Sequence, residues 1–215
     1  MGQLLKKELR LALHPTAFIF LLLSSMLMIP NYPYLVVFFY TGLAVFFTCL
    51  TGRENRDVDF TMLLPVAKGD VVKARMLTVA LLEVAQLLTA VPFALLRQAI
   101  IREPNAAGMD ANMALLALAL VEMGLFNAVF FRGYYRDVRR VGSSFVWASV
   151  AVFLYIAVAE ATTYVVPFVR DVLDTPDPAN LGAKLVALLI GAAVFGSLTW
   201  LTCQRAQRDF ERQDI

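Results

Sequence analysis

Three glutamates lie inside long apolar stretches of this 215-residue chain. Glu83 is followed one helical turn later by Gln86, whereas Glu122 and Glu160 lie in two further stretches. An ionisable group is costly in hydrocarbon and is a functional candidate by default when it occurs there. We expect these four side chains to line a path suited to a cationic or amphipathic molecule. The alternative is that each one forms an interhelical hydrogen bond.

The residue types argue against catalysis or metal binding by this chain. His14 is the only histidine and lies outside the apolar runs, so neither an HExxH metal site nor a Ser/His pair within a bilayer can form. Cys49 and Cys203 lack the spacing of a disulfide framework or a zinc site. No Gly-Lys dipeptide occurs, and a Walker A loop requires one. We expect no enzyme activity and no bound cofactor, with any ATP and Mg held by a separate subunit.

Residues 52–75 form the longest charged stretch between apolar runs. Charges of both signs come first, an apolar cluster follows, and Asp70 is a candidate N-cap for the next helix. An amphipathic segment at a membrane surface can dock a partner protein, although a solvated linker would have a similar composition. The candidate docking residues are Glu54, Asn55, Arg56, Asp59, Phe60, Met62, Leu63, Leu64 and Pro65.

The composition requires an apolar environment for much of the chain. Apolar residues make up 60% and charged residues 17%, against roughly 45–50% and about 25% in soluble domains. Such hydrophobicity also excludes a disordered chain. About 20 apolar residues cross the hydrocarbon core as a helix. We therefore predict an all-α integral membrane protein with one transmembrane domain of six spans, at about residues 16–32, 34–51, 76–96, 112–131, 143–168 and 185–203.

Residues 1–15 are expected to form an amphipathic elbow helix. Leucines cover one arc of this segment and Lys6, Lys7 and Arg10 the other, a pattern typical of helices that lie in the membrane interface. Pro15 then turns the chain into the bilayer. No small-residue cleavage site follows, so we expect a retained span and not a signal peptide. Alternatively, the basic residues serve only to orient the chain.

Lysine and arginine are distributed unevenly between the two sides. If the chain crosses the membrane six times, fifteen of the nineteen basic residues lie on one side, in segments 1–15, 52–75, 132–142 and the tail 204–215. The other side of the membrane then has Arg97, Arg102, Arg170 and Lys184. The positive-inside rule then predicts cytoplasmic termini in the cell membrane. The opposite loops are too short for a receptor or enzyme domain, and a net charge of +2 gives no case for nucleic acid.

The order of these segments resembles the membrane subunits of type-2 ABC exporters, whose permeases have six spans. The resemblance rests on Glu54, on Leu64-Pro65-Val66, on Lys68 and on the run Val72-Lys73-Ala74-Arg75. Many relatives have Ser or Thr and then Arg after the Pro-Val pair, where this chain has Ala67 and Lys68. This difference bears on which subfamily the chain resembles more than on its resemblance to the family.

The resemblance implies a coupling helix, within residues 55–64, that sits in a groove of an ATP-binding subunit. The loop from Arg132 to Arg140 would be a second contact, or simply positive-inside charge. It further implies a homodimer, two ATPase copies and export of an amphipathic or hydrophobic substrate such as a peptide, an antimicrobial or a lipid-like molecule. The alternative function is an ATP-independent carrier or membrane scaffold, which would lack an ATPase partner.

Overall fold

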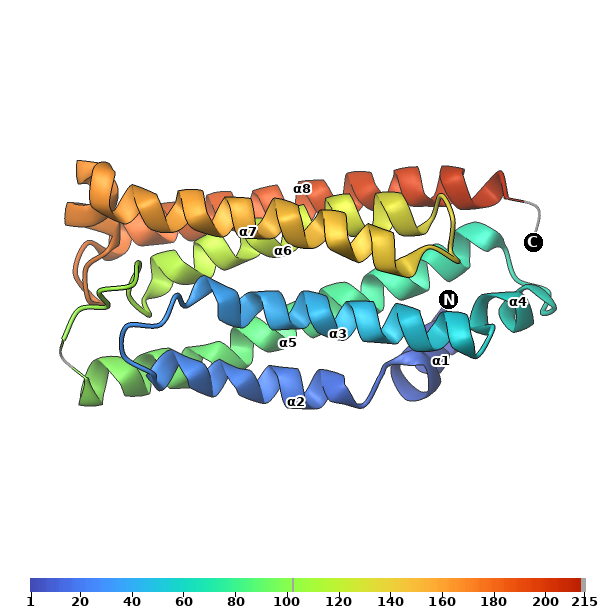
Figure 1. Ribbon diagram of the computed structural model, residues 1–215, viewed down its shortest axis with the longest axis horizontal. Coiled ribbons are helices and arrows are strands. Elements are labelled where there is room, and N and C mark those ends of the chain that lie inside the picture. Colours follow the sequence, from blue (N-terminus) through green and yellow to red (C-terminus); the bar gives the residue numbers. More distant parts are fainter. Residues whose placement is uncertain (102, 214–215) are drawn as a thin grey trace.

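The computed structural model describes residues 1–101 and 103–213, and every regular element in these ranges is a helix. Five long helices run along the molecule (Figure 1). Each is apolar enough to cross a bilayer, and 20 residues of helix span about 30 Å. The predicted all-α membrane fold is confirmed. The five helices are α3 Leu35–Glu54, α5 Lys68–Ile100, α6 Met113–Tyr134, α7 Val141–Val165 and α8 Leu181–Glu211.

The first predicted span is shorter than expected. Helix α2, Thr16–Leu22, continues as the 3-10 helix η2, Leu23–Met28. Together they rise about 22 Å at 1.5 and 2.0 Å per residue, less than the ~30 Å of hydrocarbon. Helical structure ends before Pro30, and Asn31 adopts a left-handed conformation with φ of 55°. This short helix packs against α3 and α5, so the predicted first span lies beside the five long helices without reaching their length.

The chain begins with an elbow. Helix α1, Gly2–Lys7, continues as the π-helix η1, Glu8–Ala12. This unit meets the α2–η2 helix at a bend of 82°, and Pro15 stands at the N-cap of α2. Its leucines remain half-buried or exposed, whereas Glu8 is buried. The predicted turn at Pro15 is present, but the residue most enclosed by protein is an acid.

Two helices extend beyond the predicted spans. Helix α5 begins at Lys68 with Ala67 as its N-cap, so Asp70 is not the cap residue and instead lies in the first turn. A carboxylate there still interacts favourably with the helix dipole. Helix α8 continues to Glu211 through most of the predicted tail. Hydropathy detects only the part of a helix that can contact lipid. Charged residues such as Lys73 and Arg75 continue the same helix beyond the apolar part, so the helix is longer than the predicted span.

Helix α6 is the centre of the bundle. It packs most extensively against α8 and then against α7. The α6–α8 contact is close because Gly191 lies beside the Ala117 carbonyl: a Cβ on Gly191 would be 2.5 Å from that oxygen. On another side, Phe126 and Phe130 stack with centroids 5.3 Å apart within the core. Small residues and aromatic rings therefore fix how the helices approach.

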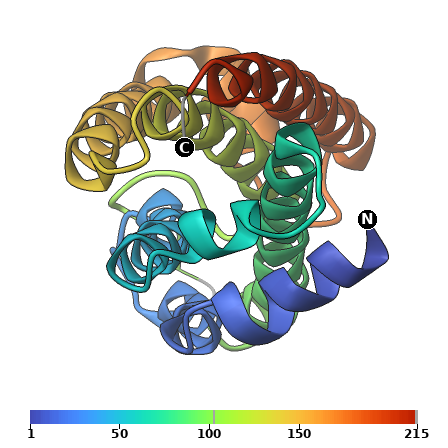
Figure 2. The ribbon, with the colours of Figure 1, turned by 90° about the vertical axis from the view of Figure 1, so that its right-hand side faces the viewer.

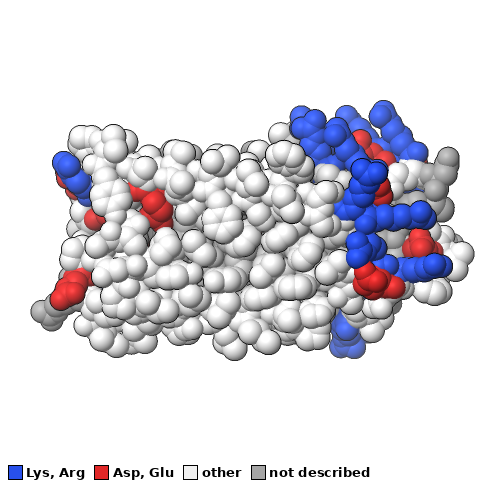
Figure 3. Space-filling model, in the orientation of Figure 1, with Lys and Arg blue, Asp and Glu red and all other residues white. Residues whose placement is uncertain are grey.

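The two ends of the bundle differ in charge. The end with α1, helix α4 (Asp57–Met62), the α6–α7 loop and the C-terminal part of α8 carries most of the lysines and arginines, and we call it the basic end (Figures 1 and 3). At the opposite end, Arg97 pairs with Asp110 at 3.1 Å and Lys184 with Asp177 at 2.8 Å. Burial raises the pKa of Asp110 above its ordinary value. Arg102 lies outside the described residues.

Candidate functional site

Helix α4 lies across the basic end between the ends of α3 and α5 (Figure 2). Helix α3 ends at Glu54, and Arg56 then adopts a left-handed conformation with φ of 52°. That conformation is uncommon for a residue other than glycine, asparagine or aspartate. The turn allows α4 to begin at Asp57, and the Phe60 amide donates to the Arg56 carbonyl at 3.0 Å. The predicted coupling helix, residues 55–64, is thus a six-residue helix with a turn at each end.

One face of α4 and the following turn present large apolar side chains to the surroundings. Phe60, Leu63 and Leu64 are 65%, 81% and 56% exposed. Apolar side chains grouped among charges at a surface mark interaction sites. Of the predicted docking residues, Met62 is half-buried and packs on the core. The other eight are exposed: Glu54, Asn55, Arg56, Asp59, Phe60, Leu63, Leu64 and Pro65.

The opposite face of α4 is anchored by an ion cluster. The Arg75 guanidinium donates to Asp57 at 2.8 Å and to both carboxylate oxygens of Glu8. The Lys7 ammonium lies 2.5 Å from Asp57 and 3.1 Å from Glu8, and it donates to the Thr61 hydroxyl at 3.1 Å. The cluster joins the elbow, α4 and the start of α5. A displacement of α4 must therefore also move the elbow or α5.

The sequence alone does not reveal this cluster. Lys7 is expected on the basic face of the elbow and Arg75 in the basic run before the third span, and neither Glu8 nor Asp57 is among the candidate residues. Glu8 is the single acid in a basic helical segment, which is a usable indication that it has a specific partner. The partner itself is 67 residues away in the sequence, and only the folded arrangement brings the two together.

A groove of about 450 Å³ connects α4 with the α6–α7 loop. Arg53 at the end of α3 donates to the Arg139 carbonyl at 3.3 Å. The two predicted contact segments therefore lie side by side and form one continuous surface. The groove is lined by Gly52, Arg53, Arg56, Val58, Asp59, Tyr134, Val138 and Arg139.

Two of the predicted path residues meet inside the bundle. Glu83 and Glu122 line one internal cavity of about 10 Å³, barely enough for one water. The Asn127 amide donates to Glu83 at 3.0 Å and to Thr199 at 3.3 Å, which links α5, α6 and α8. Neither carboxylate oxygen of Glu122 has a hydrogen-bond partner within the described part of the chain. Buried polar groups of this kind are rare and call for a functional explanation.

The other two predicted path residues lie elsewhere. Gln86 donates to the Ser24 hydroxyl at 2.9 Å and so joins α5 to η2. Glu160 accepts from the Met109 amide at 2.8 Å and holds the α5–α6 loop at the end opposite α4. Within the described residues, no group of three or more metal-ligating side chains is placed to hold an ion.

Comparison with known proteins identifies the family. A sequence model of a protein family, described as ABC-2 family transporter protein, matches residues 3–205 of the chain. This range includes nearly all of the elbow, α4, both glutamates of the cavity and most of α8. No curated protein matches the chain, and no solved structure matches it. The family match covers most of the chain, and the helical architecture is that of a multi-pass membrane protein. The chain therefore belongs to the ABC-2 family of transporter membrane proteins.

Proposed function

We propose that this chain is the permease subunit of an ABC exporter and that α4 docks a separate ATPase subunit. The observation that carries the proposal is the two-sided nature of α4. Phe60, Leu63 and Leu64 face outward, whereas Asp57 on the other side is held by Lys7 and Arg75. A helix that offers apolar contacts outward and is tied to the membrane helices inward is suited to transmit movement.

The orientation follows from charge. The basic end carries α4 and the elbow, and lysine and arginine are enriched on the cytoplasmic side of membrane proteins. We place this end, with both termini, in the cytoplasm. An ATPase that binds ATP and Mg would then approach α4 and the neighbouring α6–α7 loop from the compartment that contains ATP.

The mechanism we propose is mechanical coupling. ATP binding closes two ATPase subunits against each other, and each carries its bound α4 along. The ion cluster transfers that displacement to the elbow and to α5. Helix α5 carries Glu83, which lines the internal cavity with Glu122, so movement of α5 relative to α6 would open or close that cavity.

The complete exporter is proposed to contain two copies of this chain and two ATPase subunits, related by a twofold axis. Exposed apolar side chains of α7, including Val150, Phe153 and Leu154, line a shallow groove of about 570 Å³ that a second copy or lipid can cover. The proposed substrate is amphipathic or hydrophobic, such as a peptide, an antimicrobial or a lipid-like molecule. Its cationic part would interact with Glu83 and Glu122.

Purification in mild detergent tests the proposal. The tagged chain should retain a protein of about 25–35 kDa, the size of one ATPase domain with additions, in a stoichiometric ratio. Mass spectrometry should identify a Walker A sequence in that protein, and the preparation should hydrolyse ATP. A preparation that contains no such protein and is indifferent to ATP would favour the ATP-independent carrier or scaffold.

A further inference from the structure

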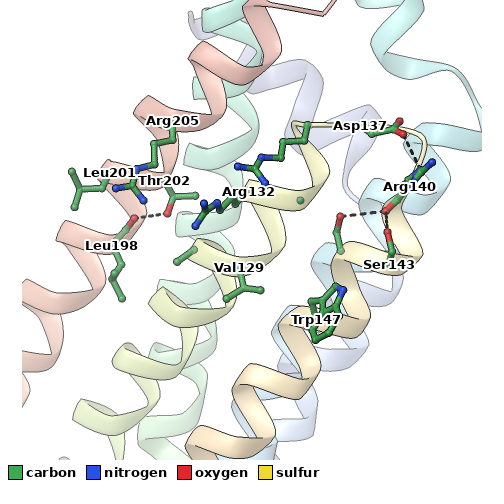
Figure 4. A pocket seen from close by; sticks show the side chains of 14 residues that line it. Val129, Arg132, Asp137, Arg140, Ser143, Trp147, Leu198, Leu201, Thr202 and Arg205 are labelled. Atoms are coloured by element: carbon green, nitrogen blue, oxygen red, sulfur yellow. Dashed lines mark hydrogen bonds and ion pairs between the residues drawn. The ribbon is translucent and has the colours of Figure 1, made fainter.

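A second feature of the basic end is a groove of about 700 Å³ formed by α6, α7 and α8. The C-terminal part of α6 lies between the other two helices, and side chains from all three enter the groove (Figure 4). It differs in lining from the groove beside α4. Its lining combines arginines and one acid, Asp137, with serines, a tryptophan and aliphatic side chains, the main ones being Arg132, Arg136, Arg140, Arg205, Trp147 and Leu201.

The arginines of this groove lack strong acidic partners. Arg136 is 3.9 Å from Asp209, and Arg140 is 3.1 Å from Asp137, but both arginine side chains are more than half exposed, so these pairs contribute little. Arg132 and Arg205 form no ion pair with any residue that the structure describes. Figure 4 shows their side chains extending into the same part of the groove from α6 and α8. Like charges brought together in this way attract an anion.

The position of the groove points to a membrane lipid. Arg132 directly follows the apolar run that ends at residue 131, and Arg205 lies two residues beyond the run that ends at 203. Both therefore lie at the depth of lipid headgroups. Trp147 and Leu201 extend the lining toward the apolar middle and are 68% and 43% exposed. Tryptophan is enriched at the interface between the lipid headgroups and the hydrocarbon core.

We propose that this groove binds an anionic phospholipid of the cytoplasmic leaflet. Its phosphate lies between Arg132 and Arg205, and an acyl chain follows Trp147 and Leu201. Guanidinium groups bind phosphate through paired hydrogen bonds, and basic pockets between membrane helices on the cytoplasmic side are suited to anionic headgroups. An acidic protein segment would match the charge but not the apolar half of the groove. The proposal uses the cytoplasmic orientation given above but does not require an ATPase.

Fluorescence quenching provides a local readout. The chain has two tryptophans, Trp147 and Trp200, so Trp200→Phe leaves Trp147 in the groove as the single reporter. This variant is reconstituted in vesicles that contain brominated phosphatidylglycerol or brominated phosphatidylcholine with identical acyl chains. We expect the anionic lipid to quench Trp147 at lower mole fraction than the zwitterionic lipid, and we expect salt to reduce the difference.

Charge variants then test the assigned residues in the Trp200→Phe background. Arg132→Gln with Arg205→Gln should lower the preference for the anionic lipid by about 30-fold, which is about 2 kcal/mol at 1.4 kcal/mol per tenfold change. The matched control, Arg208→Gln with Arg212→Gln, removes the same charge from exposed positions outside the groove and should retain the preference within about twofold. Replacing Arg132 and Arg205 by lysine keeps the charge and should give an intermediate loss.

Three results would overturn the proposal. The Trp200→Phe reporter could show equal quenching by both lipids, or the glutamine variant in the same background could keep the preference. The two double variants could also lose it equally, which would indicate general surface charge. If the Arg132 and Arg205 variant retains lipid preference but no longer co-purifies with the ATPase, the groove is a protein contact. Because the quenching experiment uses the permease alone, its outcome is independent of whether an ATPase partner is found.

Discussion

At the residue scale, Arg75 is buried with acidic partners from two distant segments. Glu8 comes from the elbow and Asp57 from α4. Burying charges costs several kcal/mol per ion, so such a cluster contributes to geometry more than to net stability. Removing one member of the cluster nevertheless destabilises the protein, because the charge that it compensated stays buried without that partner. The cluster therefore fixes where α4 sits, and its loss should be visible in the stability of the whole chain.

Glu8→Gln should destabilise the protein. It leaves Arg75 with Asp57 as its one remaining acidic partner among the described residues, and we expect a loss of about 3 kcal/mol in the free energy of unfolding. Thermal unfolding in detergent measures the change. The control is Glu54→Gln, because Glu54 is exposed and pairs with the half-exposed Arg53, so its loss should cost less than about 0.5 kcal/mol. Equal stability of the two variants would contradict the role of the cluster.

Glu83 and Glu122 allow a test of function at the same scale. Replacing both with glutamine removes two ionisable groups but keeps a hydrogen-bond acceptor for Asn127. We expect export of a cationic substrate to fall about tenfold, with assembly unchanged. Transport into inverted vesicles and size-exclusion chromatography measure the two quantities. Unchanged export would leave both acids as packing residues.

At the element scale, the sequence predicted the spans better than their ends. Runs of apolar residues located α3, α5, α6, α7 and α8 because each of these helices has a stretch that must face lipid or core. The same runs did not reveal that the first span changes to a 3-10 helix at Leu23. Asp70 was the candidate N-cap of α5, since a carboxylate is a common cap, whereas Ala67 occupies that position. Hydropathy contains no information on backbone hydrogen bonding.

The α6–α8 contact gives a prediction at this scale. Gly191→Ala would place a methyl group 2.5 Å from the Ala117 carbonyl oxygen, so the two backbones must separate. We expect a loss of about 1–3 kcal/mol in stability, as for other overpacked contacts. Gly196→Ala on the same helix meets no atom within 4 Å and should cause no loss. Thermal unfolding of the two variants compares them directly, and equal behaviour would argue against a close helix contact at Gly191.

At the scale of the whole molecule, α4 is the element that joins an external surface to the membrane helices. Sequence analysis predicted the segment and the exposed apolar side chains Phe60, Leu63 and Leu64. It could not predict that Asp57 binds Lys7 and Arg75, because these contacts join segments that are far apart in the chain. The interior acids were predicted to share one path; Glu83 and Glu122 line one internal cavity, and the path itself stays a prediction. The docking role of α4 remains a prediction.

Changing the outward face of α4 should separate ATP hydrolysis from transport. Leu63→Asp with Leu64→Asp places two charges in an apolar contact, while both positions lie outside the spans, so the helices should still insert. We expect ATP-dependent export to be lost, and ATP hydrolysis to become insensitive to substrate. Leu63→Met with Leu64→Met preserves the apolar surface and should behave as wild type. Normal coupling in the aspartate variant would remove the coupling assignment.

The most direct test of the central claim is site-specific photocrosslinking in the co-purified complex. A benzophenone amino acid replaces Phe60 on α4, and in a matched variant it replaces Phe168, which is similarly exposed but lies at the other end of the bundle. We expect a crosslink from position 60 to the ATPase and none from position 168. An intact complex in which position 60 gives no crosslink to the ATPase, or in which position 168 gives an equal one, would contradict this expectation.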